Sequence, residues 1–402
     1  MIPIADAVQI VLQQSPKLKV EAVALSHALG RVLAEDVVAD SDLPPFDRAQ
    51  MDGYAVRADD VANTPARLRI VGESAAGSGW HHEMKAGEAV RIMTGAPVPA
   101  GADAVQQVEL TREIDGNAIV EILESVETGR SIVRQAAEIK SGETVLRAGE
   151  DITAAMIATL ASFGYAQVKV GCRPRVAVMA TGSELVDVDQ KPARDQIRDS
   201  NNYTIAAYAT LAGATVERLP LAGDDTEELK RQIAAAAGRS DVLITSGGVS
   251  MGVYDFTKAA MKELGAEIFF ERVALRPGKP TVFGRLGETL IFGLPGNPVS
   301  VAVTFNLFAR AALRVMQGAK QPQLAEETAL LARDLKGSMD RESYLPAVLR
   351  TDGRGTLLAE PLKWGGSSDF VAFARATALI NVPAGIKILE QGQPVKIVRL
   401  PG

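Results

Sequence analysis

The sequence predicts a multidomain α/β plus β protein, with a central doubly wound α/β domain, a β-rich inserted module, a discontinuous helical or mixed domain and a C-terminal barrel-like β domain. Three observations support this prediction. The chain has 402 residues, which indicates two to four domains. Short β-rich and helical runs alternate between Arg175 and Gly318, which favours a mainly parallel sheet with helices on both faces. Short alternating apolar runs dominate the segments before and after that region.

Four parts of the chain differ in pattern and give the predicted domain boundaries. Residues 1–39 and 139–171 carry helical patterns and are expected to form one discontinuous domain. Residues 40–138 are rich in Pro, Gly and short alternating runs, which predicts an inserted β-rich domain. Residues 172–318 form the expected α/β domain, and residues 319–402 the C-terminal β domain.

The predicted helices carry start and stop signals. The helix over Thr226–Ala237 has Asp225 as its cap, Glu228 three residues later, and Gly238 at its end. A second helix is expected over Thr153–Phe163, closed by Gly164. The remaining runs of the α/β domain, β-rich or helical, are Val176–Ala180, Asn202–Leu211, Val216–Leu221, Val242–Thr245, Thr257–Leu264, Ile268–Leu275, Thr281–Phe283, Leu290–Phe292 and Val299–Met316.

The composition is that of a soluble globular protein, with 47% hydrophobic and 23% charged residues. The net charge of −6 argues against a general binder of nucleic acids or anionic membranes, because such a protein needs an excess of basic surface. The single cysteine, Cys172, excludes an intrachain disulfide and is expected to be a small buried apolar residue. No window approaches the roughly 20 apolar residues of a membrane span, and no signal-peptide pattern opens the chain, so we expect a cytoplasmic protein.

Three glycine-containing turns follow predicted strands of the α/β domain. They are Thr181–Glu184, Thr245–Ser250 and Gly293–Ser300. In open α/β sheets, ligands bind at the carboxyl ends of the strands, where glycine lets the backbone approach closely and helix starts attract anions. Pro298 suits the first position of a helix. One such turn is weak evidence, but three on one edge favour a phosphate-bearing ligand.

Charged residues near the same edge suggest an oxyanion and a metal. The turn Arg276–Pro280 holds two cations between prolines, and its alternative is a solvated surface turn. The acidic residues are Glu184, Asp199 and Asp255. Asp199 could equally be a plain helix cap, and Asp255 could cap the Thr257 helix. Carboxylates that face a phosphate require a divalent cation between them, which points to Mg²⁺.

These motifs resemble the molybdopterin molybdenumtransferases of the MoeA type, a family related to the C-terminal domain of gephyrin. The resemblance covers essentially the whole chain and rests on motifs in the same order: Phe46–Asp47, Met51–Val56, Arg91–Pro97, Thr181–Leu185, Ser246–Ser250, Arg276–Pro280 and Gly293–Ser300.

The resemblance implies an enzyme that takes adenylylated molybdopterin and molybdate, releases AMP with the help of Mg²⁺, and leaves molybdenum on the dithiolene. It implies a homodimer whose active site lies between the α/β domain of one subunit and the β module around Asp52 of the other. An adenylyltransferase-like protein would supply the substrate.

The resemblance and the loop analysis together give the candidate site. The predicted catalytic residues are Asp52, Asp199 and Asp255, and the predicted metal ligands are Glu184, Asp199 and Asp255. The predicted substrate-binding residues are Thr94, Thr181, Gly182, Glu184, Ser246, Gly247, Gly248, Ser250, Arg276, Lys279, Pro280, Pro295, Gly296, Asn297, Pro298, Ser300, Ser367 and Ser368.

Three alternative functions remain open at this point. The segment Gln135–Glu138 departs from the family pattern, which motivates a non-catalytic carrier or sensor of molybdopterin or molybdate. A scaffolding protein ranks low, because the chain lacks the extra domain and long linker expected of one. Another enzyme that shares only the α/β domain, such as a molybdopterin adenylyltransferase or a nucleotide deamidase, is disfavoured by the Asp52 and Thr94 motifs.

Overall fold

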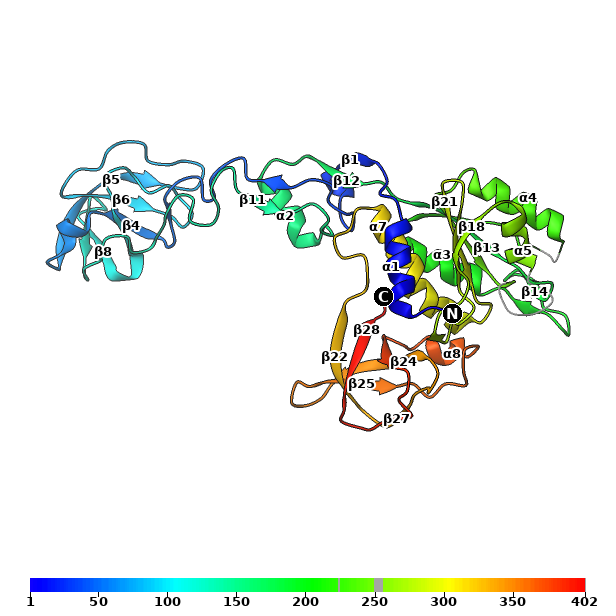
Figure 1. The fold of residues 1–402 in the computed structure, drawn as a ribbon. Coiled ribbons are helices and arrows are strands. Elements are labelled where there is room, and N and C mark those ends of the chain that lie inside the picture. Colours follow the sequence, from blue (N-terminus) through cyan, green and yellow to red (C-terminus); the bar gives the residue numbers. More distant parts are fainter. Residues whose placement is uncertain (223–224, 249–255, 402) are drawn as a thin grey trace. The chain divides into compact units, whose positions relative to one another are not determined.

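The computed structural model describes residues 1–222, 225–248 and 256–401. The chain forms two compact units. The first, here the α/β–barrel unit, comprises Met1–Glu35, Ala148–Ala154 and Gln167–Gly402, and the second, here the β unit, comprises Asp36–Arg147 and Ala155–Ala166. The predicted fold class is confirmed, because an α/β sheet, a β-rich module and a C-terminal barrel are all present (Figure 1).

The α/β–barrel unit begins with helix α1 (Ile4–Gln14), whose apolar side chains Ile4, Val8 and Val11 are buried. The predicted helical character of residues 1–39 is wrong beyond Gln14. Strand β1 (Val20–Ala24) follows and pairs antiparallel with β12 (Gln167–Gly171). A strand depends on its partner, which here lies far along the chain, so the local pattern could not reveal it.

The central sheet of this unit has six strands in the order β16-β13-β17-β21-β20-β18. Strands β16, β13, β17 and β21 are parallel, whereas β20 runs antiparallel to both of its neighbours. The strands are β13 (Arg175–Ala180), β16 (Thr215–Arg218), β17 (Val242–Ser246), β18 (Glu267–Phe270), β20 (Val282–Leu286) and β21 (Thr289–Leu294). This is the doubly wound arrangement that the alternating pattern predicted.

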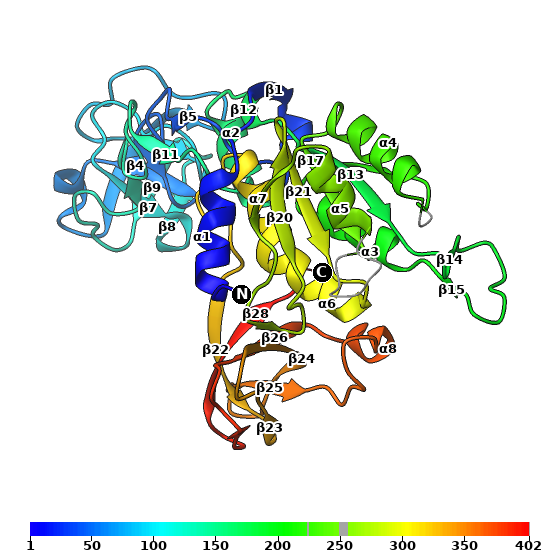
Figure 2. The same cartoon turned by 45° about the vertical axis from the view of Figure 1, so that its right-hand side comes forward.

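Helices cover both faces of the central sheet (Figure 2). One face packs against α1 together with α3 (Asn201–Leu211), α6 (Pro298–Thr304), a π-helical turn (Phe305–Ala309) and α7 (Arg310–Met316). The other face packs against α4 (Thr226–Ala237) and α5 (Phe256–Glu263). The stretch Pro298–Met316 is long and apolar enough to cross a membrane, but 83% of it is buried, which is typical of a core helix.

The predicted helix signals are confirmed where the structure describes them. The carboxylate of Asp225 accepts hydrogen bonds from the amides of Glu227 and Glu228, at 2.9 and 3.2 Å, and α4 ends at Gly238. Pro298 is the first residue of α6. The first amides of a helix have no partner within the helix. The Asp225 carboxylate supplies partners for two of them, and proline at the first position has no amide to leave unpaired, so both residues stabilise their helix starts.

A short ribbon projects from the α/β domain between β13 and α3 (Figure 2). Its two strands, β14 (Leu185–Val186) and β15 (Ile197–Arg198), pair in parallel, with Leu185 opposite Ile197 and Val186 opposite Arg198. The amide of Asp199 donates to the carbonyl of Val186 at 2.9 Å. The β14–β15 ribbon therefore begins beside Glu184 and ends beside Asp199.

The C-terminal part of the unit is a closed five-stranded barrel. Its strands pair around the circle in the order β24-β25-β22-β28-β26 and back to β24. Strand β19 (Leu275–Arg276) pairs with β24 and so joins the turn after it to the barrel. The other elements are β22 (Glu326–Leu331), β23 (Leu335–Lys336), β24 (Glu342–Thr351), β25 (Leu357–Pro361), α8 (Phe370–Phe373), β26 (Ala378–Val382), β27 (Ile388–Leu389) and β28 (Pro394–Arg399).

The β unit is built on a six-stranded sheet in the order β7-β4-β6-β5-β9-β8. Helix α2 (Ala154–Ser162) extends into it and is followed by Gly164 at φ +74°, as predicted. The phenol oxygen of Tyr165 accepts a hydrogen bond from the amide of Val38. The strands are β2 (Val37–Val38), β3 (Arg48–Ala49), β4 (Gly53–Val56), β5 (Ala66–Ser74), β6 (Glu88–Ile92), β7 (Ala104–Gln107), β8 (Thr111–Ile114), β9 (Ile119–Ile122), β10 (Ile132–Val133) and β11 (Thr144–Leu146).

Candidate functional site

A cleft of about 970 Å³ opens at the carboxyl edge of the central sheet. It is lined by the ends of β13, β17 and β21, by the β14–β15 ribbon, by the first turn of α3 and by the segment before α8. Predicted site residues that line it are Thr181, Glu184, Asp199, Ser246, Gly247, Gly296, Asn297, Pro298 and Ser368. The three glycine turns therefore do meet in one place, as their positions after parallel strands predicted.

The turns after β13 and β17 pack against each other so closely that glycine is required. The amide of Thr181 donates to the carbonyl of Ser246 at 2.9 Å. Gly247 has φ +91°, and a Cβ there would lie 2.4 Å from the Thr181 carbonyl oxygen. Gly248 has φ +61°, and its Cβ would lie 2.2 Å from the hydroxyl oxygen of Thr257. Any larger residue would push these turns apart, so the glycines fix the floor of the cleft.

Asn201 is a site residue that the sequence analysis missed. Its Nδ2 donates to the hydroxyl of Ser246 at 2.8 Å and to the carbonyl of Gly296 at 2.6 Å. It therefore ties the first turn of α3 to the ends of both β17 and β21. An asparagine in the first turn of a helix is common, so the sequence offered no signal for this role.

The acidic residues lie at the two ends of the β14–β15 ribbon. Glu184 precedes β14, and its carboxylate folds back against Gly182. Asp199 follows β15, is 3% exposed, and accepts a hydrogen bond from the amide of Asn202 at 3.0 Å. In the register of the paired strands, Glu184 and Asp199 lie three residues apart along the ribbon, a backbone separation of about 10 Å.

Burial raises the pKa of Asp199 above its ordinary value, although hydrogen bonds from Asn202 and Asn201 oppose this shift. The expected metal ligand Asp255 and the expected substrate residue Ser250 lie outside the described residues. Within residues 1–222, 225–248 and 256–401, no three His, Cys, Asp or Glu side chains gather into a metal cluster.

The cationic turn Arg276–Pro280 does not line the cleft. The guanidinium of Arg276 donates from Nη1 to the carbonyl of Gly337 at 3.2 Å, next to the barrel. The hydroxyl of Thr281 donates to the carbonyl of Gly278 at 2.6 Å and closes the turn. Lys279 is half-buried, and its ammonium has no hydrogen-bond or ion-pair partner within the described ranges.

The barrel contributes to the cleft through the segment before α8. The side-chain amide of Asn297 donates to the hydroxyl of Ser367 at 2.8 Å, and the amide of Val299 donates to the Ser367 carbonyl at 3.0 Å. Ser368 and Phe370 line the cleft itself. The predicted residues Gly182, Gly248, Pro295 and Ser367 adjoin lining residues in the chain without lining the cleft themselves, and Ser300 lies two residues after the lining residue Pro298.

Asp52 and Thr94 come together in the β unit. One carboxylate oxygen of Asp52 accepts hydrogen bonds from both the amide and the hydroxyl of Thr94, at 2.7 and 2.8 Å. These bonds hold the pKa of Asp52 below its usual value, because they stabilise the ionised form. The two residues that the resemblance singled out in this unit thus form one solvent-exposed acidic group.

The segment Gln135–Glu138 is bonded within the same unit. The amide of Gln135 donates to Asp47 at 2.8 Å, its side chain donates to Asp42 at 2.9 Å, and Glu138 pairs with Arg48 at 2.8 Å. The residues of segment 135–138, which depart from the family pattern, therefore stabilise a local turn within the β unit.

Cys172 is half-buried, and burial raises the pKa of its thiol, which makes it a poor nucleophile.

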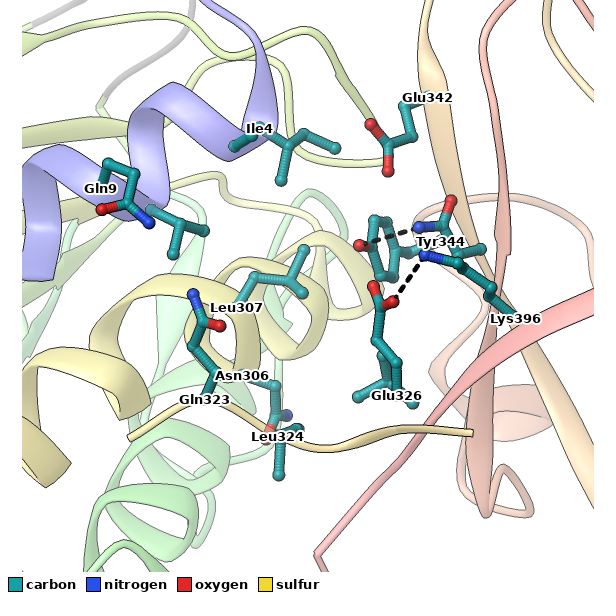
Figure 3. Close-up of a pocket in the computed structure, with 14 residues that line it drawn as sticks. Ile4, Gln9, Asn306, Leu307, Gln323, Leu324, Glu326, Glu342, Tyr344 and Lys396 are labelled. Carbon is teal, nitrogen blue, oxygen red and sulfur yellow. Dashed lines mark hydrogen bonds and ion pairs between the residues drawn. The ribbon is translucent and has the colours of Figure 1, made fainter. Parts of the chain in front are cut away.

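A second cavity, of about 350 Å³, lies between α1, the π-helical turn and the barrel (Figure 3). Lys396 pairs with Glu326 at 2.9 Å, and the phenol of Tyr344 accepts a hydrogen bond from Asn381. Burial and the neighbouring Glu342 raise the pKa of Tyr344. None of the predicted site residues lines this cavity and no glycine turn opens into it, so the larger cleft is the candidate site.

Comparisons with known proteins identify the family of this chain. Three family models match in order: the MoeA N-terminal region (domains I and II) over residues 2–164, a probable molybdopterin binding domain over residues 177–315, and the MoeA C-terminal region (domain IV) over residues 328–400.

Full-length relatives agree with these models. A molybdopterin molybdenumtransferase from Bacillus subtilis is 36% identical over 99% of this chain and 94% of its own length. One from Haemophilus influenzae is 34% identical over 96% of this chain and 97% of its own length.

Solved structures agree as well. Two crystal structures of MoeA proteins for molybdopterin biosynthesis from Pyrococcus horikoshii match with TM-scores of 0.83 and 0.86, at 31% and 27% identity, with complete coverage of both chains. The same order of domains, the same fold and more than a third of the residues of a full-length relative lead to one conclusion: this chain belongs to the MoeA family.

Proposed function

We propose that this protein is a molybdopterin molybdenumtransferase. It takes adenylylated molybdopterin and molybdate, cleaves the bond between the adenylate and the pterin phosphate, and releases AMP as molybdenum passes to the dithiolene. The observation that carries the proposal is the convergence of three glycine turns and two carboxylates in one cleft. Such a cleft suits a phosphate-bearing ligand whose reaction needs charge stabilisation and a metal.

The cleft residues have separable tasks in this reaction. The turns at Gly247 and Gly296 let the substrate phosphates approach the backbone, and Asn201 holds these turns at a fixed spacing. Ser368 offers a hydroxyl to the ligand, whereas the Ser246 hydroxyl accepts from Asn201 and donates to the carbonyl of Pro295 at 3.4 Å. No side chain needs to act as a nucleophile, because the oxyanion or a water molecule can attack. The protein therefore contributes positioning and electrostatic stabilisation.

The acidic residues of the cleft fit a magnesium ion. Mg²⁺ is usually held by one or two carboxylates together with waters and substrate phosphates, so a dedicated three-ligand cluster is not required. Either Asp199 or Glu184 would hold the ion together with waters and substrate phosphates, because about 10 Å of backbone separates the two residues, and Asp255, the third expected ligand, lies outside the described residues. The burial that raises the pKa of Asp199 disfavours an unpaired carboxylate there, and a bound cation would reverse that effect. The ion would neutralise the charge that develops on the departing phosphate.

Our proposal includes a homodimer in which Asp52 and Thr94 of one subunit complete the cleft of the other. The Asp52 carboxylate is exposed and held ionised by Thr94, which leaves it free to contact a ligand brought by a second chain. We place the enzyme in the cytoplasm, where an adenylyltransferase-like protein would supply the adenylylated carrier.

The direct test of the activity is release of AMP. Purified protein is incubated with adenylylated molybdopterin, molybdate and Mg²⁺, and AMP is measured by chromatography. Release that depends on molybdate and is lost in Asp199→Asn supports the proposal. Tight binding of the carrier without release of AMP would instead identify the non-catalytic carrier or sensor that segment 135–138 motivated.

A mixing experiment tests the shared active site. Asp52→Ala and Asp199→Asn are each expected to be inactive as homodimers. If the site is built from two subunits, co-refolding them produces heterodimers with one intact site, and activity returns to about a quarter of the wild-type value. The presence of heterodimers is verified with a tag. If the mixture then recovers no activity, the two residues either belong to the site of the same subunit or belong to no active site, and the shared site is refuted.

A further inference from the structure

Arg198 is a cation of the cleft that no motif singled out. It is the last residue of β15, its side chain is exposed, and it lines the cleft. Its Nε donates to the carbonyl of Gln190 at 3.0 Å. Within the described ranges, the two terminal amino groups of its guanidinium have no hydrogen-bond or ion-pair partner. They are therefore free to bind an anion.

The β14–β15 ribbon holds Arg198 in place. Val186 lies opposite Arg198 in the parallel pairing, and the next residue, Asp199, is hydrogen-bonded to the Val186 carbonyl. The phenol of Tyr203 in α3 donates to Asp187 at 3.0 Å, which fastens the ribbon to the helix that follows. The amide of Ile197 donates to the carbonyl of Glu184 at 2.8 Å, so the backbone of Arg198 is fixed between Ile197 and Asp199, and only its side chain needs to order on binding.

The charges of the cleft favour a basic side chain at this position, in addition to the proposed magnesium ion. Its acidic lining residues are Glu184 and Asp199, and Arg198 is its one basic residue among the described parts of the chain. Arg276 and Lys279, which the sequence suggested as anion ligands, do not line it. A phosphate brought near two carboxylates needs compensation, and a guanidinium supplies it with paired hydrogen bonds that match the geometry of a phosphate.

We propose that Arg198 binds the phosphate of the nucleotide part of the substrate. The inference rests on the proposed function and deepens it, since it names the residue that recognises the adenylate. Arg198 touches the ligand through its terminal amino groups, while its Nε bond to Gln190 sets the direction of the guanidinium.

The test measures binding of AMP and of adenosine by calorimetry, without molybdate or carrier. Arg198→Ala removes the guanidinium, Arg198→Lys keeps the charge but not the fork, and Arg194→Ala removes an exposed arginine of the same ribbon that does not line the cleft. A charge-assisted hydrogen bond contributes about 1.5–3 kcal/mol, so Arg198→Ala should weaken AMP binding by about tenfold to a hundredfold. Arg198→Lys should give an intermediate loss, and Arg194→Ala should bind AMP as the wild type does.

Adenosine locates the effect at the phosphate. All four proteins should bind adenosine equally, because it lacks the group that Arg198 recognises. Unchanged AMP binding in Arg198→Ala, an equal loss for adenosine and AMP, or no AMP binding by the wild-type protein would each overturn the inference.

Failure of the proposed reaction is detected separately. A protein that binds AMP through Arg198 but releases none from the adenylylated carrier would keep this inference and refute the transferase activity. If the Arg198→Ala variant releases AMP with full activity, the transferase activity is kept and this inference is refuted.

Discussion

Replacing Asn201 by alanine tests how the cleft is held together. The substitution removes two hydrogen bonds, to the Ser246 hydroxyl at 2.8 Å and to the Gly296 carbonyl at 2.6 Å. A hydrogen bond contributes about 0.5–1.5 kcal/mol net, so two contribute about 1–3 kcal/mol. The Oδ1 of Asn201 is buried and has no hydrogen-bond partner among the described residues, so its removal offsets part of this loss. We therefore expect the free energy of unfolding of the α/β–barrel unit to fall by about 1–2 kcal/mol.

The two tryptophans allow this unit to be followed alone. Trp364 packs against two of the hydrophobic cores of the α/β–barrel unit, whereas Trp80 packs against one of the cores of the β unit. A protein with two compact units is not expected to unfold in one step, so a mixed signal would mislead. Urea unfolding is best followed by Trp364 fluorescence in a Trp80→Phe background. Thr210→Ala, which removes a hydrogen bond within α3 only, is the matched control.

Catalysis should suffer more than stability in Asn201→Ala. The turns at Gly247 and Gly296 would no longer be held at a fixed spacing, so kcat/KM for release of AMP should fall at least tenfold under conditions where the variant is folded. If both the unfolding free energy and kcat/KM stay at the wild-type values, Asn201 does not hold the cleft together, and the reasoning is refuted.

Four further predictions follow from single contacts. Asp199→Asn should abolish AMP release yet stabilise the metal-free protein near pH 7. Burial raises the pKa of Asp199 in the folded protein, so the neutral carboxyl favours folding. This contribution is fully present below the ordinary pKa of 3.8 and is lost as the pH rises through the folded-state pKa. The stability advantage of the variant in thermal melts should therefore shrink as the pH falls towards 3.8. Thr94→Ser should leave the pKa of Asp52 depressed, whereas Thr94→Ala should raise it, which NMR titration of the carboxyl measures; equal values in both would exclude the hydroxyl bond. Gly247→Ala should destabilise the α/β–barrel unit and abolish activity, because its Cβ would lie 2.4 Å from the Thr181 carbonyl; a wild-type melting curve would contradict this. Asp225→Ala should cost about 1 kcal/mol in urea unfolding through loss of the α4 cap, and Asp225→Asn should restore most of it.

The sequence by itself determined the features that depend on neighbouring residues. Asp225 and Gly238 marked the bounds of α4, Pro298 marked the start of α6, and the alternation of strands and helices predicted the doubly wound sheet. Glycine turns after parallel strands also predicted that Thr181, Gly247 and Gly296 would share one edge, because all parallel strands end on the same side.

Only the tertiary structure decided the features that depend on partners far along the chain. Strand β1 was mistaken for helix because its partner β12 lies far away in sequence. The Arg276–Lys279 turn was predicted to bind an anion; the pairing of β19 with the barrel places this turn beside the barrel, and among the described residues that line the cleft the basic one is Arg198. Asn201 gave no signal at all, because its role depends on where β17 and β21 end in space. Local sequence fixes where elements begin and end, whereas packing fixes which side chains meet.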